Sequence, residues 1–220
     1  MFAETANVAR TPAAPAPGGS VDLKAIAGVW RGLGRSRPDS ESTGIATLDQ
    51  ALLGGWPVGA LSQIVSQESG LGFSLMLPLL ARLTRAGRHA ALIAPPYIPY
   101  APALSDAGVE LQRLLWLAPR DRVDALWAAE QMLRSGLYGA VALWSHALEA
   151  PIERRLQLAA ETGRSVGIVA YAGVHGAHST AAVRLQVKPA AAALSVEIVR
   201  CRGARPGQRV ECAFPLRRAA

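Results

Sequence analysis

The chain has 220 residues, of which 50% are hydrophobic and 18% are charged, and its mean hydropathy is +0.20. This composition excludes a chain that is disordered throughout, and the length excludes a minimal disulfide scaffold, so we expect one principal domain with a full hydrophobic core. The formal net charge of +7 is concentrated near one end, because residues 181–220 carry eight basic side chains against two glutamates.

Membrane insertion, secretion and metal binding are not indicated. Uncharged runs are shorter than the roughly 20 apolar residues of a membrane-spanning helix, or they are broken by prolines, as in residues 89–105. The first residues include Glu4 and lack the apolar stretch of a secretion signal. Cys201 and Cys212 do not have a zinc-type spacing. We therefore expect a cytoplasmic protein with no cofactor, no metal and no membrane contact.

Residues 1–42 are predicted to be a linker region with one short amphipathic helix. The tract 11–19 is rich in proline, alanine and glycine and is typical of an extended linker. Apolar residues recur every three to four positions over residues 21–33, which predicts a helix. Because such a short helix is marginal alone, it must dock on its own core or on a partner, and both options stay open. Val29 and Trp30 are candidate partner-binding residues.

Residues 43–200 are predicted to form the core, an α/β domain with a doubly wound, mainly parallel sheet. Apolar runs predict strands and amphipathic runs predict helices, and their alternation is typical of such a sheet. A pair of antiparallel strands is expected at one edge, over residues 181–187 and 194–200. The other expected strands are 61–65, 89–94, 114–117, 140–144 and 165–170, and the expected helices are 73–86, 120–135 and 151–163. The buried side of the 120–135 helix is expected to carry Val123, Leu126, Trp127 and Leu133.

The turn at residues 66–74 follows the first core strand and precedes a helix, which is the position of a phosphate-binding loop. Together with the preceding motifs, this order resembles the opening of a RecA-like core of the P-loop NTPase type. Those motifs are Thr43-Gly44, Leu48-Asp49, Leu53-Gly54-Gly55 and Pro57-Val58-Gly59. The resemblance implies a nucleotide position at Ser66, Glu68, Ser69, Gly70, Gly72, Phe73 and Ser74.

The catalytic residues of a P-loop are missing from this turn. Gly72 stands where the loop needs a lysine, and Phe73 stands where it needs a serine or threonine hydroxyl for Mg²⁺. The strand expected to end in a metal-binding aspartate ends instead in Trp144-Ser145. We therefore expect a degenerate, non-hydrolysing site. Two alternatives stay open: an anion-binding nest at Gly70 and Gly72, and an ATP-binding or ATP-hydrolysing repair protein with an unorthodox loop.

Longer strings resemble the ImuA family, the RecA-like proteins of bacterial mutagenesis cassettes. They are Val29-Trp30-Arg31-Gly32, Gly54-Gly55-Trp56-Pro57-Val58-Gly59, residues 79–87, residues 94–104, residues 124–131 and residues 154–161. This resemblance implies an accessory protein of SOS-induced, error-prone translesion DNA synthesis. Its implied partners are an ImuB-type Y-family-like protein, the assembly of an alternative polymerase α subunit, and RecA. The family is related to SulA, which leaves a cell-division inhibitor of the SulA type as an alternative.

Aromatic and basic residues supply the remaining candidate contacts. Tyr97 and Tyr100 lie in a proline-rich segment that is either a stiff loop or a platform for a partner or a stacked base. Trp56 lies in a turn and is a candidate for either the core or an interface. A basic C-terminal tail, residues 201–220, is predicted to contact DNA or an acidic partner, and its removal is expected to leave the core folded. The basic candidates are Arg200, Arg202, Arg205, Arg209, Arg217 and Arg218; a compositional bias toward arginine would explain them equally well.

Overall fold

The computed structural model describes residues 39–68, 70–146, 148–173, 179–191, 193–204 and 206–213. The chain divides into two units, Met1–Ser36 and Arg37–Ala220, and all described residues belong to the second. Several predicted features fall outside the described residues and are not considered further. They are the helix at 21–33 with Val29 and Trp30, and also Ser69, Arg205, Arg217 and Arg218.

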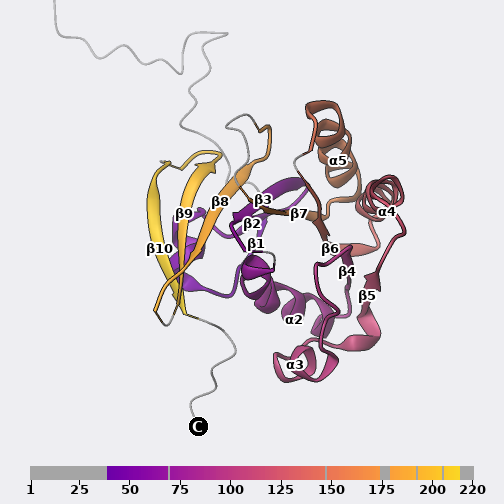
Figure 1. The fold of residues 1–220 in the computed structure, drawn as a ribbon, viewed down its shortest axis with the longest axis horizontal. Helices are drawn as coiled ribbons and strands as arrows, with labels where there is room; N and C mark the ends of the chain where they lie inside the picture. The colour runs from indigo at the N-terminus through magenta and orange to yellow at the C-terminus, as the bar shows by residue number, and fades with distance from the viewer. Residues whose placement is uncertain are drawn as a thin grey trace, which may run out of the picture. The chain divides into compact units, whose positions relative to one another are not determined.

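An eight-stranded sheet forms the centre of the second unit (Figure 1). Its strands lie in the order β10-β9-β8-β3-β7-β6-β4-β5. The block from β8 to β5 is parallel, whereas β9 and β10 are antiparallel to their neighbours. The bounds are β3 (Ala60–Ser66), β4 (His89–Ile93), β5 (Leu114–Leu117), β6 (Tyr138–Trp144), β7 (Val166–Ala172), β8 (Val183–Pro189), β9 (Ala193–Cys201) and β10 (Gln208–Ala213). The mainly parallel sheet with antiparallel strands at one edge is thereby confirmed.

The central strand β3 shows why the strands are almost continuously apolar. All seven of its residues are buried, because β7 and β8 flank it and helices cover both faces. Leu61 and Val65 join one apolar cluster, while Ile64 joins the cluster on the opposite face. A strand that is buried on both faces therefore carries apolar residues in succession rather than in alternation.

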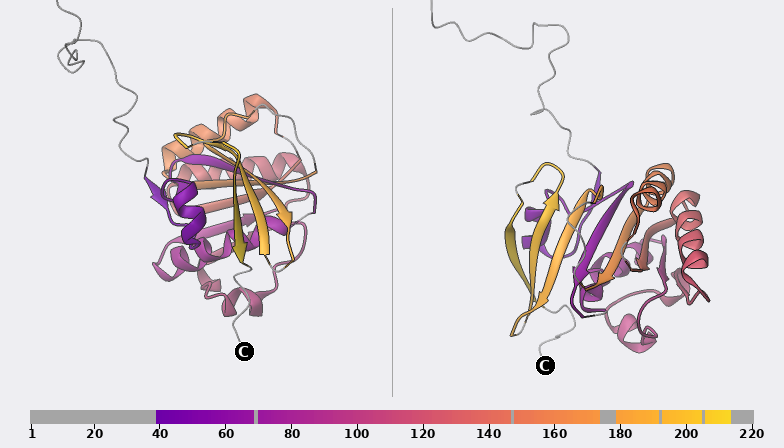
Figure 2. Two further views of the ribbon diagram at one scale, coloured as in Figure 1. Left: turned by 90° about the vertical axis from the view of Figure 1, so that its left-hand side faces the viewer. Right: turned by 45° about the horizontal axis from the view of Figure 1, so that its top comes forward.

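Helices cover the two faces of the sheet (Figure 2). α4 (Arg122–Ser135) and α5 (Ala150–Gly163) lie side by side on one face, where they contact each other and the strands β6 and β3. Residues from the short helix α1 (Ala46–Ala51) and from α2 (Leu77–Arg85) belong to the apolar cluster of the other face. Smaller helices are η2 (Leu71–Leu75), α3 (Ala101–Asp106) and η3 (Leu111–Arg113).

Local sequence signals set the limits of α4. The Asp121 carboxylate accepts a hydrogen bond from the Asp124 N–H at 2.9 Å, which caps the first turn. Gly136 ends the helix with φ of +71°, a conformation that glycine adopts without strain. The predicted helix at 73–86 begins differently, because the 3-10 turn η2 precedes α2 and the regular helix starts only at Leu77.

The predicted buried side of α4 is half right, since Leu126 is partly buried and packs against the apolar cluster of this face. Leu133 is buried, but Val123 and Trp127 are 73% and 63% exposed. The helix packs through Leu133 and through Ala125 and Ala129, whose small side chains let its backbone approach the sheet closely. Val123 and Trp127 lie outside this contact.

The core extends beyond the predicted limits of 43–200 at both ends. Strand β10 adds an edge to the sheet and buries Val210 and Cys212, so residues 201–213 are not a free tail. At the other end, the short strands β1 (Ser40–Glu41) and β2 (Trp56–Pro57) pair with each other.

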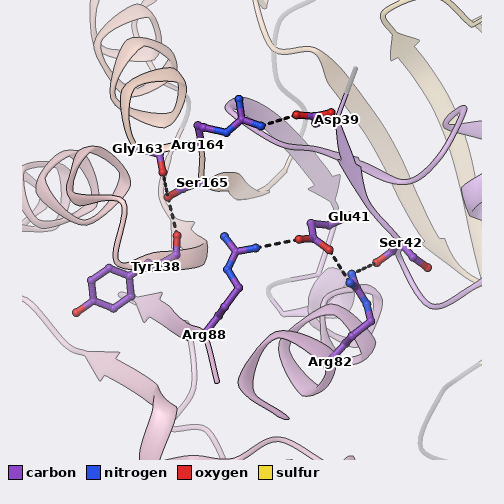
Figure 3. Close-up of polar contacts among 9 residues, drawn as sticks. All are labelled: Asp39, Glu41, Ser42, Arg82, Arg88, Tyr138, Gly163, Arg164 and Ser165. Carbon is purple, nitrogen blue, oxygen red and sulfur yellow. Dashed lines mark hydrogen bonds and ion pairs between the residues drawn. The ribbon is translucent and has the colours of Figure 1, made fainter. Parts of the chain in front are cut away.

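Ion pairs hold β1 near the amino ends of the sheet strands (Figure 3). The Glu41 carboxylate contacts the guanidinium groups of Arg82 and Arg88 at 2.5 and 2.9 Å, and Asp39 pairs with Arg164. Arg88 directly precedes β4 and Arg164 lies two residues before β7, so these contacts connect the start of the described chain to two strands far along the sequence.

The structure also decides between the two alternatives left open for Trp56, the core and an interface. Its side chain is completely buried in the same cluster as Leu48 and Leu79, which leaves no surface for a partner. The surrounding turn closes into β2 with the indole directed inward, so Trp56 is a core residue. None of the helices in the described ranges combines the length and apolar character needed to cross a bilayer.

Candidate functional site

The carboxyl ends of β3, β4, β6 and β7 meet at one edge of the sheet, where open α/β folds usually bind ligands. Two cavities of about 410 Å³ each lie there, and they share Gly70, Pro96 and Trp144. We call them the apolar pocket and the polar pocket. Each has the volume of a small-molecule or side-chain binding site.

The apolar pocket lies between the loop after β3 and the proline-rich segment after β4. Leu71, Phe73 and Leu77 contribute from the first side, and residues 95–100 contribute from the second. Tyr97, Ile98 and Tyr100 are 69%, 77% and 71% exposed, an unusual concentration of large apolar side chains at the surface. The structure thus places both predicted tyrosines at this pocket, together with Ile98, which the sequence analysis did not single out.

The loop at 66–74 uses several of its hydrogen-bond donors within itself. The Ser66 hydroxyl donates to the Glu68 carbonyl at 2.7 Å, and the Leu71 N–H points to the same carbonyl at 3.4 Å. The Phe73 N–H donates to the Gly70 carbonyl at 2.9 Å. In a phosphate-binding loop such amides point toward the ligand. These donors are therefore already engaged by the protein.

Gly72 lies tightly against β3. A Cβ atom at this position would be 2.3 Å from the Cγ2 atom of Ile64, so no side chain fits without a shift of the backbone or of Ile64. Gly72 is also buried. The position that the sequence aligns with a phosphate-binding lysine consequently has no room for one.

Phe73 and Trp144 contact each other across the strand ends. Their ring centroids are 5.8 Å apart, and the rings are tilted by 54°. These are the two positions that the sequence aligns with a metal-binding hydroxyl and a metal-binding carboxylate. The fold brings the positions together, but it joins them by an aromatic contact, whose geometry is a favourable one for two rings.

The polar pocket contains residues that the sequence analysis did not identify. Arg120 lies between β5 and α4, Arg122 is the first residue of α4, and His146 follows β6; all three are exposed. Asp121 also lines this pocket, but its carboxylate caps α4. Two arginines in the segment that leads from a strand of a parallel sheet into the next helix are a signal that could have indicated this pocket.

Tyr171 closes the buried side of the polar pocket. Its hydroxyl accepts a hydrogen bond from the Gln63 side-chain amide at 3.3 Å. Burial, followed by the negative charge of Glu153, raises the pKa of Tyr171 well above its ordinary value. The phenol therefore stays neutral and is not a candidate base.

The predicted basic residues lie elsewhere, on the antiparallel strands. Arg200 and Arg202 are exposed at the end of β9 and beyond it, and Arg200 donates to the Ser179 carbonyl. Arg209 on β10 pairs with Glu197 at 3.0 Å, which offsets part of its charge. The structure does not bring these arginines to the pocket edge, since neither cavity includes them.

Comparisons with known proteins match the part of the chain that builds this site. A family model described as "Cell division inhibitor SulA" matches residues 59–167. The SulA protein of Edwardsiella piscicida is 36% identical over 95 residues, which cover 43% of this chain and 56% of that protein. The RecA protein of Rubrobacter xylanophilus is 37% identical over 136 residues, which cover 60% of this chain and 38% of RecA.

Among solved structures, SulA from Pseudomonas aeruginosa superposes with a TM-score of 0.44 at 28% identity, covering 51% of this chain and 98% of that one. The chain spans just over half the length of the E. piscicida SulA and well under half of the R. xylanophilus RecA. The family-model and sequence matches show that the chain is a distant relative of the SulA and RecA proteins.

Proposed function

We propose that this protein binds a protein partner at the apolar pocket and does not hydrolyse nucleoside triphosphates. The contact between Phe73 and Trp144 carries the proposal. Phosphoryl transfer depends on metal ions and charged groups that stabilise the phosphates, and two aromatic rings supply neither. Exposed Tyr97 and Tyr100 beside an apolar cavity have instead the chemistry of a protein–protein contact.

The engaged amides of the loop and the close packing of Gly72 support the same proposal. At this loop the Leu71 and Phe73 amides already donate within the protein, and Gly72 stands where a lysine would contact the phosphates. We infer that a RecA-like core has here become a binding module.

The proposed setting is the DNA-damage response. The relation to SulA and RecA and the resemblance to ImuA both favour it. In this proposal the chain is an accessory protein of SOS-induced translesion synthesis that contacts an ImuB-type protein, and through it a polymerase assembly. RecA is a further proposed partner, and the exposed Arg200 and Arg202 remain candidates for contact with DNA.

Inhibition of cell division is the second candidate function. It is favoured by the SulA match to residues 59–167, which include every residue that lines the apolar pocket. Both candidates act through protein binding, so they differ in the partner rather than in the chemistry of the site.

Equilibrium dialysis with labelled ATP and Mg²⁺ tests the loss of nucleotide chemistry. We expect no saturable binding at micromolar concentrations, whereas an active RecA measured in parallel should bind. Saturable binding, or ATP turnover that disappears when Ser74 is changed, would favour the repair ATPase and contradict the proposal.

Complementation in cells that lack this gene separates the two candidate functions. We expect the wild-type chain and a Val199→Ser control to restore damage-induced mutation frequency, and Ile98→Ser to fail. Both residues are exposed, so neither change should unfold the protein. Filamentous cells on expression, with no change in mutation frequency, would indicate the division inhibitor. Full activity of Ile98→Ser in both assays would refute the role of the apolar pocket.

A further inference from the structure

The apolar pocket and the polar pocket lie next to each other at the strand ends, because Gly70, Pro96 and Trp144 line both. We call the two adjacent pockets together the groove. The groove runs from the proline-rich segment after β4 to the start of α4.

The two halves of this groove differ in chemistry. The apolar half presents Phe73, Ile98 and Tyr100, which suit a bulky aliphatic or aromatic side chain. The polar half presents Arg120, Arg122 and His146. A ligand that fills both halves must therefore combine an apolar anchor with groups that pair with cations.

Two arginines and one carboxylate line the polar half. Asp121 is the acidic residue among those lining the cavity, and it accepts the capping hydrogen bond from the Asp124 N–H. Arg120 is exposed and forms no salt bridge within the described part of the chain. An incoming carboxylate would find a cation with planar, paired donors at that end.

Single-stranded nucleic acid fits this groove less well than a peptide. Sequence-independent binding of a strand uses basic residues that follow the backbone, together with aromatic rings. Here the arginines stand at one end, and the other half is walled by Pro95, Pro96 and Pro99, which have no N–H to donate to a phosphate. Apolar walls with a cationic end match an acidic peptide with an apolar anchor.

We infer that the groove binds a segment of the partner protein in which a bulky apolar side chain lies within a few residues of aspartate or glutamate. This inference rests on the proposed function and adds the chemistry of the partner. The apolar side chain enters beside Ile98, and the carboxylate pairs with Arg120.

Phage display of random 16-residue peptides against the full chain tests this assignment. We expect the enriched peptides to carry Asp or Glu close to an aromatic or aliphatic residue. The most enriched peptide is then labelled and its Kd measured by fluorescence anisotropy. Reversing one charge should weaken binding about tenfold in Arg120→Glu, while the matched control Arg154→Glu, at an exposed position of α5 outside both pockets, stays within about twofold. A peptide with the acidic residue replaced by lysine should recover affinity for Arg120→Glu.

The outcomes separate this inference from the function on which it rests. Enriched peptides without acidic residues, whose binding is lost in Ile98→Ser, would overturn the charge assignment and leave protein binding intact. Displacement of the peptide by ATP and Mg²⁺ would refute both. A labelled oligothymidine that binds the wild type and loses affinity in Arg120→Glu and Ile98→Ser would reassign the groove to nucleic acid. A selection that enriches no peptide also counts against the inference.

Discussion

The tightest packing at the candidate site lies between the backbone of Gly72 and the side chain of Ile64. Glycine is required here for space, because an added Cβ would lie 2.3 Å from the Ile64 Cγ2 atom. Restoring a lysine at this position would therefore disturb β3 before it could reach a phosphate. The packing of the core thus excludes a lysine at residue 72, and one substitution cannot restore the phosphate-binding site.

Gly72→Ala is expected to lower the free energy of unfolding by about 1–3 kcal/mol, the usual effect of adding one carbon to a filled core. Urea unfolding followed by circular dichroism measures it. Ile64→Ala should also destabilise the protein, but the double variant should lose less than the sum of the two, because the clash is relieved. Additive losses would mean that the two residues do not contact each other.

Single residues show which features of the candidate site can be predicted from the sequence and which cannot. The missing lysine and hydroxyl were evident from the residues at 72 and 73 alone. The contact of Phe73 with Trp144 was not, because it depends on the strand order β3-β7-β6, which no local pattern contains. Trp56 was ambiguous because a turn sequence does not say on which side its indole will pack.

At the scale of elements, the bounds of helices and strands were easier to predict from the sequence than the face of a helix that is buried. The strand 114–117 was predicted at the bounds that the structure has, and α4 began two residues later than expected. Its buried face was right for Leu126 and Leu133 and wrong for Val123 and Trp127, because every large apolar residue was assumed to face the sheet, whereas alanines fill much of that face. The short elements α1 and α3 were missed, since each has only six residues and carries little periodic signal.

The ion pairs of Glu41 attach β1 to the rest of the unit. The Glu41 side chain is only 18% exposed, and it contacts Arg82 and Arg88 together, so it should contribute more than a surface pair. We expect Glu41→Ala to lower the free energy of unfolding by about 1 kcal/mol at low ionic strength, and by less in about 1 M NaCl.

Glu110→Ala is the matched control, because its pair with Arg113 is half exposed on both sides. Chemical unfolding of the two variants at both salt concentrations provides the comparison. Equal effects of the two substitutions would show that β1 gains nothing from having two arginine partners.

At the scale of the whole molecule, the C-terminal boundary changes how truncations must be designed. Removal of residues 201–220 was expected to leave the core folded, but β10 pairs with β9 along Gln208–Ala213. Val210 and Cys212 also belong to the main apolar cluster. The arginines of residues 201–220 suggested a charged tail, although Val210 and Cys212 alternate with polar residues as they do on a half-buried strand.

We expect a chain that ends after Arg202 to lose at least about 2 kcal/mol of unfolding free energy, because two buried side chains and one strand are removed. A chain that ends after Ala213 retains β10 and serves as the control. Thermal and urea unfolding of both chains measures the difference. Coincident transitions would show that β10 contributes nothing to the fold.

The prolines beside the apolar pocket bear on the thermodynamics of any complex formed there. Pro95, Pro96 and Pro99 fix three backbone torsions before a ligand arrives, so little conformational entropy remains to be lost when the rim is occupied. Burial of Tyr97 and Ile98 would release hydration water and give a negative change in heat capacity. Calorimetry over a range of temperatures would then record the signature of rigid docking rather than of folding coupled to binding.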